Sequence, residues 1–109
     1  MPTDQIRLKA SIRFLSTEEG GRTSPLSGGY SYRPNHNFFE PDDRNMCIGS
    51  IELEEGKLVL PGETIQTEIT ILFDPTKEPE FIVGREWYIQ EGRKPVALGT
   101  ILEVLSPFA

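Results

Sequence analysis

Apolar and polar residues alternate with a period of two through most of this chain. In residues 6–15 every second side chain is apolar, and those between are polar or basic apart from Leu15 at the end. The apolar positions are Ile6, Leu8, Ala10, Ile12 and Phe14. This alternation predicts a strand with one buried and one solvated face. The basic side, with Arg7 and Lys9, is interpreted as a solvated surface, and a phosphate-contacting stripe is the alternative.

Residues 47–73 carry the clearest pattern and predict a strand, a tight turn, a short strand, a Pro-Gly turn and a long strand. Gly56 lies at the first reversal, and Pro61-Gly62 forms the second. Gly62 supplies the positive φ that a type II turn begun by proline requires at its third position. In residues 65–73 β-branched side chains recur with a period of two, which favours a half-buried strand over a helix. We expect this stretch to be the seed of a larger sheet.

The remaining elements are also predicted to be strands. Aromatic residues spaced by two in residues 30–39 indicate a strand that Pro34 confines to an edge or an irregular segment. Trp87 and Ile89 mark another, with Trp87 as a core anchor, and residues 96–105 form the last. No segment has the periodicity of an amphipathic helix. About six strands without a helix predict an all-β sandwich or barrel.

Paired glycines mark a long loop in residues 17–32. A phosphate-binding loop of the G-x-x-x-x-G-K-[ST] type needs a lysine and a following helix. Gly20-Gly21 and Gly28-Gly29 have neither, so we reject a nucleotide-binding loop here. A loop of this length in a compact domain is usually functional or mobile.

Composition is that of an ordinary globular domain. The chain has 109 residues, 37% hydrophobic and 26% charged, which is enough for one domain with one modest core. No apolar run approaches the ~18 residues of a membrane-spanning helix, and the first residues lack a signal-peptide pattern. A single cysteine, Cys47, excludes an internal disulfide framework. We therefore expect a cytoplasmic protein without a membrane partner.

The charge balance bears on nucleic acids. The net charge is −6, from 11 basic and 17 acidic residues. Phosphate contacts dominate nucleic-acid affinity, so this balance disfavours tight, autonomous binding. A local basic patch can still exist within an acidic whole.

Residues with catalytic potential are few. His36 is the only histidine and Cys47 the only thiol, so no metal-ligand spacing exists. Cys47 begins a strand among apolar neighbours, where an inert buried thiol is expected rather than a nucleophile paired with histidine. Asp42-Asp43 lies in a turn beside a proline, and no G-x-S-x-G elbow is present. We therefore predict that the chain is not an enzyme and that it binds neither a cofactor nor a metal ion.

Several short motifs occur in a definite order. They are Leu15-Ser16-x-x-Glu19-Gly20-Gly21-Arg22, Gly29-Tyr30 with Tyr32-Arg33-Pro34, Gly49-Ser50-Ile51-Glu52-Leu53-x-x-Gly56, Pro61-Gly62-Glu63, and Ile89-Gln90-Glu91-Gly92-x-x-x-Val96-x-x-Gly99. In this order and spacing they resemble the third, C-terminal β-barrel domain of bacterial elongation factor Tu. The resemblance implies a six-stranded closed antiparallel barrel over about residues 6–105, in a single domain of residues 1–109, with residues 47–73 as its central meander.

The resemblance also implies particular contacts. In the family this domain contacts the T-stem of aminoacyl-tRNA, packs on the GTPase domain and meets the nucleotide-exchange factor. The family's T-stem glutamate matches Glu91, and the glycine that follows it in the family is kept as Gly92. Asn35 stands where the family has glutamine, Ile48 where it has threonine, and Glu40 where it has a basic residue. With no GTPase domain in the sequence, we expect a free-standing relative that binds no nucleotide.

Three arginines lie in or beside these motifs. Arg22 and Arg33 are each expected to bond backbone carbonyls across a loop, or alternatively to contact a phosphate or a partner. The same two alternatives apply to Arg93. The candidate RNA or partner contacts are Arg22, Arg33, Asn35, Glu91, Gly92 and Arg93.

Two functions follow as hypotheses. The first is a non-catalytic protein-interaction module with an unidentified protein partner, self-association into a homo-oligomer included. The alternative is an RNA-binding module with low affinity for the acceptor and T-stem backbone of tRNA. The acidic balance and the changed position Ile48 favour the first, whereas Glu91-Gly92 and Arg33 favour the second.

Overall fold

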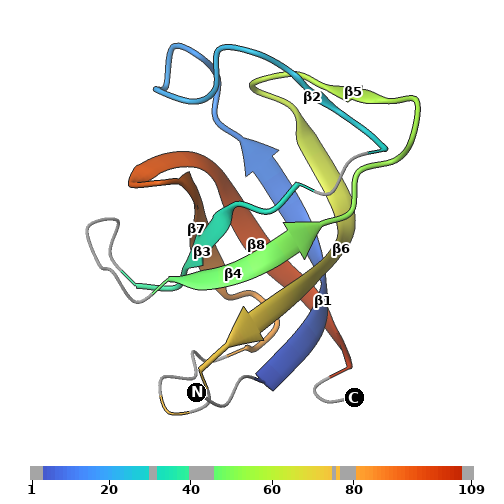
Figure 1. Ribbon diagram of the computed structural model, residues 1–109, viewed down its shortest axis with the longest axis vertical. Coiled ribbons are helices and arrows are strands. Elements are labelled where there is room, and N and C mark those ends of the chain that lie inside the picture. Colours follow the sequence, from blue (N-terminus) through green and yellow to red (C-terminus); the bar gives the residue numbers. More distant parts are fainter. Residues whose placement is uncertain (1–3, 30–31, 40–45, 75, 77–80, 107–109) are drawn as a thin grey trace.

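The computed structural model describes residues 4–29, 32–39, 46–74, 76 and 81–106, and these contain eight strands. The strands are β1 (Asp4–Phe14), β2 (Leu26–Ser27), β3 (Asn35–Asn37), β4 (Cys47–Ile51), β5 (Leu58–Val59), β6 (Thr64–Phe73), β7 (Glu86–Glu91) and β8 (Lys94–Ser106). Six of them close into an antiparallel barrel in the order β1-β6-β4-β3-β7-β8 (Figure 1). The predicted all-β closed barrel is confirmed.

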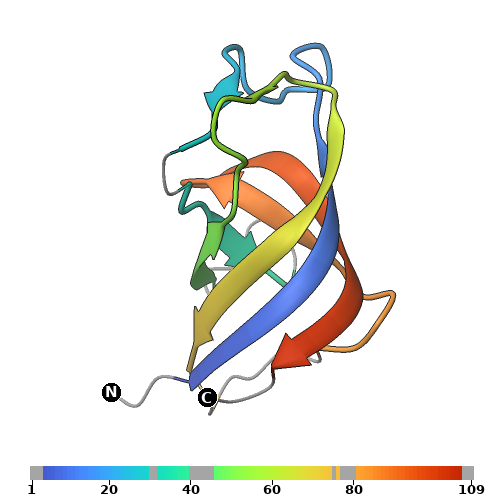
Figure 2. The same ribbon diagram turned by 90° about the vertical axis from the view of Figure 1, so that its right-hand side faces the viewer.

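Strand β1 lies between the two other long strands of the barrel, β6 and β8. Figure 2 shows the three side by side, in yellow, blue and red. All five apolar positions predicted for the inner face of β1 are buried. The alternation therefore identified both the strand and its buried face.

The turns predicted in residues 47–73 are confirmed, with φ of 80° at Gly56 and 91° at Gly62. The prediction of a continuous meander is wrong for β5. Strand β4 pairs directly with β6, and β5 leaves the barrel to form a two-stranded ribbon with β2. Figure 1 shows this ribbon beyond one end of the barrel. The departure brings residues 26–27 against residues 58–59.

Strand β3 is an interior strand of the barrel wall, so the edge alternative is wrong, whereas Pro34 lies in the irregular segment that was the other alternative. It pairs with β4 on one side and with β7 on the other. Pro34 precedes the strand, so its missing N–H removes no hydrogen bond from the ladder. Polar side chains are tolerated inside because they bond to one another: Asn37 Nδ2 donates to Gln90 Oε1 over 2.7 Å.

A hydrogen-bonded chain crosses the core from β7 to β4. Trp87 Nε1 donates to His36 Nδ1 over 3.0 Å. Since an indole nitrogen can only donate, Nδ1 accepts, and Nε2 carries the proton donated to the Gly49 carbonyl at 3.2 Å. Burial lowers the pKa of His36 to about 4, so its ring is neutral at pH 7. Trp87 is 2% exposed, which confirms it as a core anchor.

Two glycines make room for this chain. A Cβ on Gly49 would lie 2.8 Å from both His36 Cδ2 and the Thr70 carbonyl oxygen. One on Gly99 would lie 2.5 Å from the ring of Trp87. Both positions require glycine because of close packing rather than because of an unusual φ.

A β-bulge interrupts the pairing of β7 with β8. The register shifts between Ile89 and Gln90 of β7, and the additional residue of the bulge, Val96, lies in β8. A bulge breaks the strict alternation of inward and outward side chains, and Val96 and Ala97 are both buried. Glu91, the residue after Gln90, is exposed.

Cys47 is buried, and burial raises the pKa of its thiol to about 11, which agrees with the predicted buried thiol. Within the described ranges, no set of three or more acidic, histidine or cysteine side chains is placed to hold a metal ion. No helix in the described part of the chain has the length and apolar character needed to cross a bilayer.

Candidate binding surface

The motif at residues 15–22 forms a compact turn that presents Arg22. The Ser16 N–H donates to Glu19 Oε1 over 2.9 Å, and the Glu19 N–H donates to Ser16 Oγ over 3.1 Å, which is the reciprocal arrangement of a capping box. The pKa of Glu19 is held below its ordinary value. The largest cause is the hydrogen bond from the Ser16 backbone, and the next is the hydrogen bond from the Arg13 guanidinium. Gly21 is required because a Cβ would lie 2.3 Å from the Leu15 carbonyl oxygen.

Arg22 is placed against Glu91, which lies 69 residues later in the sequence. Its guanidinium forms an ion pair with the Glu91 carboxylate, and its Nε donates to the Ser24 carbonyl over 3.2 Å. Tyr32 completes the cluster, since its hydroxyl donates to Glu91 Oε2 over 2.6 Å. Burial, and then the bond to Glu91, raise the pKa of Tyr32. Arg22 therefore bonds the carbonyl of a residue only two positions away rather than one across the loop, and it also pairs with Glu91.

The strand register brings the positions equivalent to the family's T-stem contacts together. Asn35 on β3 is the partner of Gln90 on β7, next to Glu91, and also of Ile48 on β4. Asn35 is half-buried and Ile48 is 60% exposed. These positions form one stripe across three neighbouring strands. Glu40, the fourth position of that set, lies outside the described residues, as does Asp42-Asp43.

A shallow hollow of about 200 Å³ adjoins this stripe, and we call it the β4–β6 hollow. It is lined by Gln5, Arg33, Ile48, Gly49, Ser50, Thr70 and Leu72. Ile48 and Leu72 are cross-strand partners with exposed fractions of 60% and 42%. Of the lining residues that the structure describes, only Arg33 is charged, and within the described part of the chain it forms no salt bridge.

The other predicted contact residues lie in the turn between β7 and β8. Gly92 has φ of 64°, and Arg93 is exposed. The structure thus joins Arg22 to Glu91 directly, places Arg33 in the hollow and leaves Arg93 on the turn. The prediction omitted Leu72, although the alternation in β6 already placed it on the solvent side.

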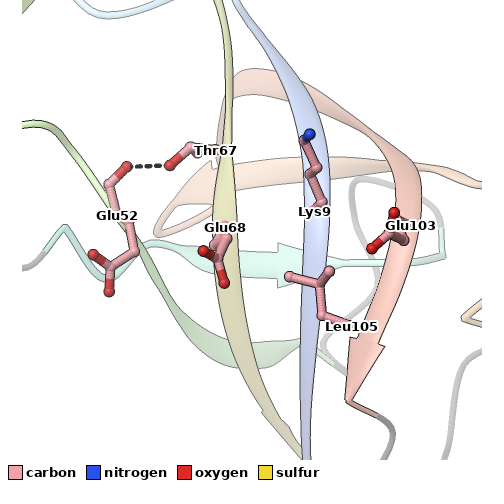
Figure 3. Close-up of a pocket in the computed structure, with 6 residues that line it drawn as sticks. All are labelled: Lys9, Glu52, Thr67, Glu68, Glu103 and Leu105. Carbon is pink, nitrogen blue, oxygen red and sulfur yellow. Dashed lines mark hydrogen bonds between the residues drawn. The ribbon is translucent and has the colours of Figure 1, made fainter.

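The basic side of β1 faces carboxylates. Lys9 lies between Glu68 on β6 and Glu103 on β8, in a shallow depression of about 490 Å³ (Figure 3). Arg7 forms an ion pair with Glu68, and Arg13 pairs with a carboxylate of the adjacent turn. This arrangement agrees with the interpretation of a solvated, mixed-charge surface and disfavours a phosphate-contacting stripe.

Comparison with known proteins shows to which family this chain is related. No protein-family profile matches the chain. Elongation factor Tu 2 of Streptomyces avermitilis is 34% identical over 98 residues, which are 90% of this chain and 23% of that protein. The chain thus spans about a quarter of the length of that relative, and the similar region does not include its GTPase domain. The identity along nearly the whole chain and the closed six-stranded barrel together identify this chain as a relative of the C-terminal β-barrel domain of elongation factor Tu.

Proposed function

We propose that this chain is a non-catalytic protein-interaction module related to translation factors, and that it docks a partner protein on the outer face of β3, β4 and β6. The exposed cross-strand pair of Ile48 and Leu72 carries the proposal. Single exposed apolar side chains are normal on protein surfaces. Two of them side by side, forming the floor of a hollow, are a place where a partner gains by covering them.

The magnitude limits what this pair can do alone. Full burial of an isoleucine or leucine side chain contributes about 1.5–3 kcal/mol, and these two are already about half covered. They therefore add about 2 kcal/mol together, whereas association costs at least about 4 kcal/mol in lost freedom of motion. The pair is an anchor, and the partner must also contact the neighbouring stripe with Asn35 and the hollow's rim at Arg33.

Charge and the resemblance support the same function. A net charge of −6 disfavours a nucleic-acid backbone as the main ligand. Ile48 presents an apolar side chain where the family has a hydroxyl. Glu91, the family's polar contact, is already bonded to Arg22 and Tyr32.

A photo-crosslinking amino acid at Ile48 tests the proposal in the cells that produce the protein. We expect an adduct that protease digests and ribonuclease does not, and that Leu72→Glu abolishes. The same crosslinker at Thr64, an exposed position elsewhere on β6, is the control. An Ile48 adduct that ribonuclease removes, or equal adducts from both positions, would contradict the proposal.

An RNA-binding role is the second candidate, and a specific observation favours it. Arg33, Arg93 and Lys94 are exposed and, among the described residues, form no salt bridge. Tyr32 and Glu91 are hydrogen-bonded to each other. Arg33 directly follows Tyr32 in the sequence, and Arg93 lies two residues after Glu91. A gel-shift titration with bulk tRNA at low salt tests this role. Binding that weakens steeply with added salt supports it, and no shift at tens of micromolar protein rejects it.

A further inference from the structure

We infer that the β4–β6 hollow recognises a partner segment in which a carboxylate lies beside an apolar side chain. The inference rests on the proposed function and names the chemistry of its partner. The apolar side chain covers Ile48 and Leu72, and the carboxylate bonds the guanidinium of Arg33.

Arg33 is a cation available at this surface. Among the residues that the structure describes, it is the only charged one that lines the hollow, and no described carboxylate pairs with it. Arg22, another of the predicted contact residues, is already engaged by Glu91. A guanidinium offers two parallel donors that match a carboxylate, so an incoming Asp or Glu side chain is the ligand that fits it.

The rest of the lining suits a peptide. Ser50 and Thr70 are cross-strand partners whose hydroxyls can bond peptide groups, and Ile48 and Leu72 form the apolar floor beside them. The volume of about 200 Å³ is below the roughly 300–1,000 Å³ of small-molecule pockets. The hollow therefore fits one or two side chains of an extended segment rather than a cofactor.

The lining argues against the other ligand classes. Single-stranded RNA is held by aromatic side chains on which its bases stack, and none of the described lining residues is aromatic. A lysine-bearing segment would find no carboxylate among these described lining residues. The overall charge of −6 attracts cations in general, but at physiological salt its influence fades over about 8 Å, so the residues in contact decide.

Nuclear magnetic resonance titration of the full ¹⁵N-labelled chain tests the inference with three N-acetylated tripeptide amides, Leu-Glu-Leu, Leu-Gln-Leu and Leu-Lys-Leu. We expect Leu-Glu-Leu to shift the backbone amides of Ile48, Ser50 and Thr70. It should bind at least about threefold more tightly than Leu-Gln-Leu, which is the scale of an exposed ion pair. This preference should disappear in Arg33→Gln and persist in Arg93→Gln, the matched exposed arginine outside the hollow.

Several results would overturn the inference. A preference for Leu-Glu-Leu that survives Arg33→Gln would place the carboxylate elsewhere. Equal binding of all three peptides in the hollow would remove the charge selectivity and leave the docking function intact. Shifts of the same amides by poly-uridylate but by no peptide would assign the hollow to RNA. If no probe shifts these amides, the inference fails, and the crosslink at Ile48 judges the proposed function independently.

Discussion

The indole N–H of Trp87 donates a hydrogen bond to Nδ1 of His36 across the barrel interior, over 3.0 Å. The other ring nitrogen of His36 donates to the Gly49 carbonyl. One neutral imidazole on β3 is therefore hydrogen-bonded to both β7 and β4. The same three strands carry Glu91, Asn35 and Ile48 on their outer side. The buried chain thereby fixes the relative positions of the residues in the candidate surface.

His36→Leu should lower the free energy of unfolding by about 2–4 kcal/mol. The substitution leaves the Trp87 N–H and the Gly49 carbonyl without partners in the core, and each unsatisfied group costs about 1–3 kcal/mol. Urea denaturation followed by the fluorescence of Trp87, the single tryptophan, measures the loss. Asn35→Ala, one residue earlier on the outer side, should change stability far less; a similar loss from both would contradict a special role for the imidazole.

Stability should fall in acid through His36. Its pKa is about 4 in the folded protein and 6.5 in the unfolded chain, so the unfolded state binds the proton more readily. The stabilisation is fully present above pH 6.5 and is lost as the pH falls towards 4. Between pH 7.5 and pH 5 we expect a loss of about 2 kcal/mol. The His36→Leu variant, which lacks any histidine, should show this change only in small part; an undiminished change would assign it to carboxylates.

Gly49→Ala should destabilise the barrel by about 1–3 kcal/mol, because the added methyl group overlaps both the His36 ring and the Thr70 carbonyl oxygen. Denaturant unfolding of Gly49→Ala, of His36→Ala and of the double variant measures how much of the loss comes from the overlap with His36. Since the smaller side chain removes one of the two overlaps, the combined loss should be less than the sum. Strict additivity would show that the His36 contact is unimportant.

Cys47 should react slowly with Ellman's reagent while the protein is folded. Its pKa of about 11 leaves little thiolate at pH 8, and the side chain is buried. We expect the rate to rise by roughly a hundredfold or more in urea above the unfolding midpoint. Comparable rates in the folded and unfolded protein would mean that the thiol is accessible.

The ion pair of Arg22 and Glu91 should contribute a coupling of about 0.5–1 kcal/mol in a double-mutant cycle with Arg22→Gln and Glu91→Gln. Its side chains are 22% and 38% exposed, so water screens the pair only in part. The pair of Lys57 and Glu54, at 68% and 71% exposed, is the control and should show a smaller coupling. Equal couplings would mean that the Arg22 cluster adds no more than an ordinary surface pair.

The sequence predicted those elements whose side chains follow the local geometry of a strand. β1 alternates through residues 6–14 and β6 through residues 65–71. Pro61-Gly62 forms the turn that its residues require. A strand near β3 was predicted, but its place inside the barrel wall was not, because Asn35, His36 and Asn37 have no apolar periodicity. Their burial depends on partners elsewhere in the chain, such as Trp87 and Gln90, which no local pattern reveals.

The sequence predicted which residues belong to the candidate surface, but it did not predict how they lie relative to one another. The resemblance pointed to Asn35, Ile48 and Glu91, whereas their adjacency follows from the register of three strands. The pairing of Arg22 with Glu91 could not be predicted from spacing, because it joins a loop to a strand end far along the chain. Alternation did place Leu72 on the solvent side, but only the register shows it beside Ile48.

The closure of the barrel has a kinetic consequence. The wall is sealed by β1 against β8, with register partners such as Leu8 and Val104 at nearly opposite ends of the sequence. Pairings of such long sequence separation form slowly, because the chain must lose much of its freedom before they contribute. During synthesis β1 and β6 can already pair, while the outer edge of β1 stays open until β8 leaves the ribosome. That interval is when this chain is most exposed to pairing with another nascent strand.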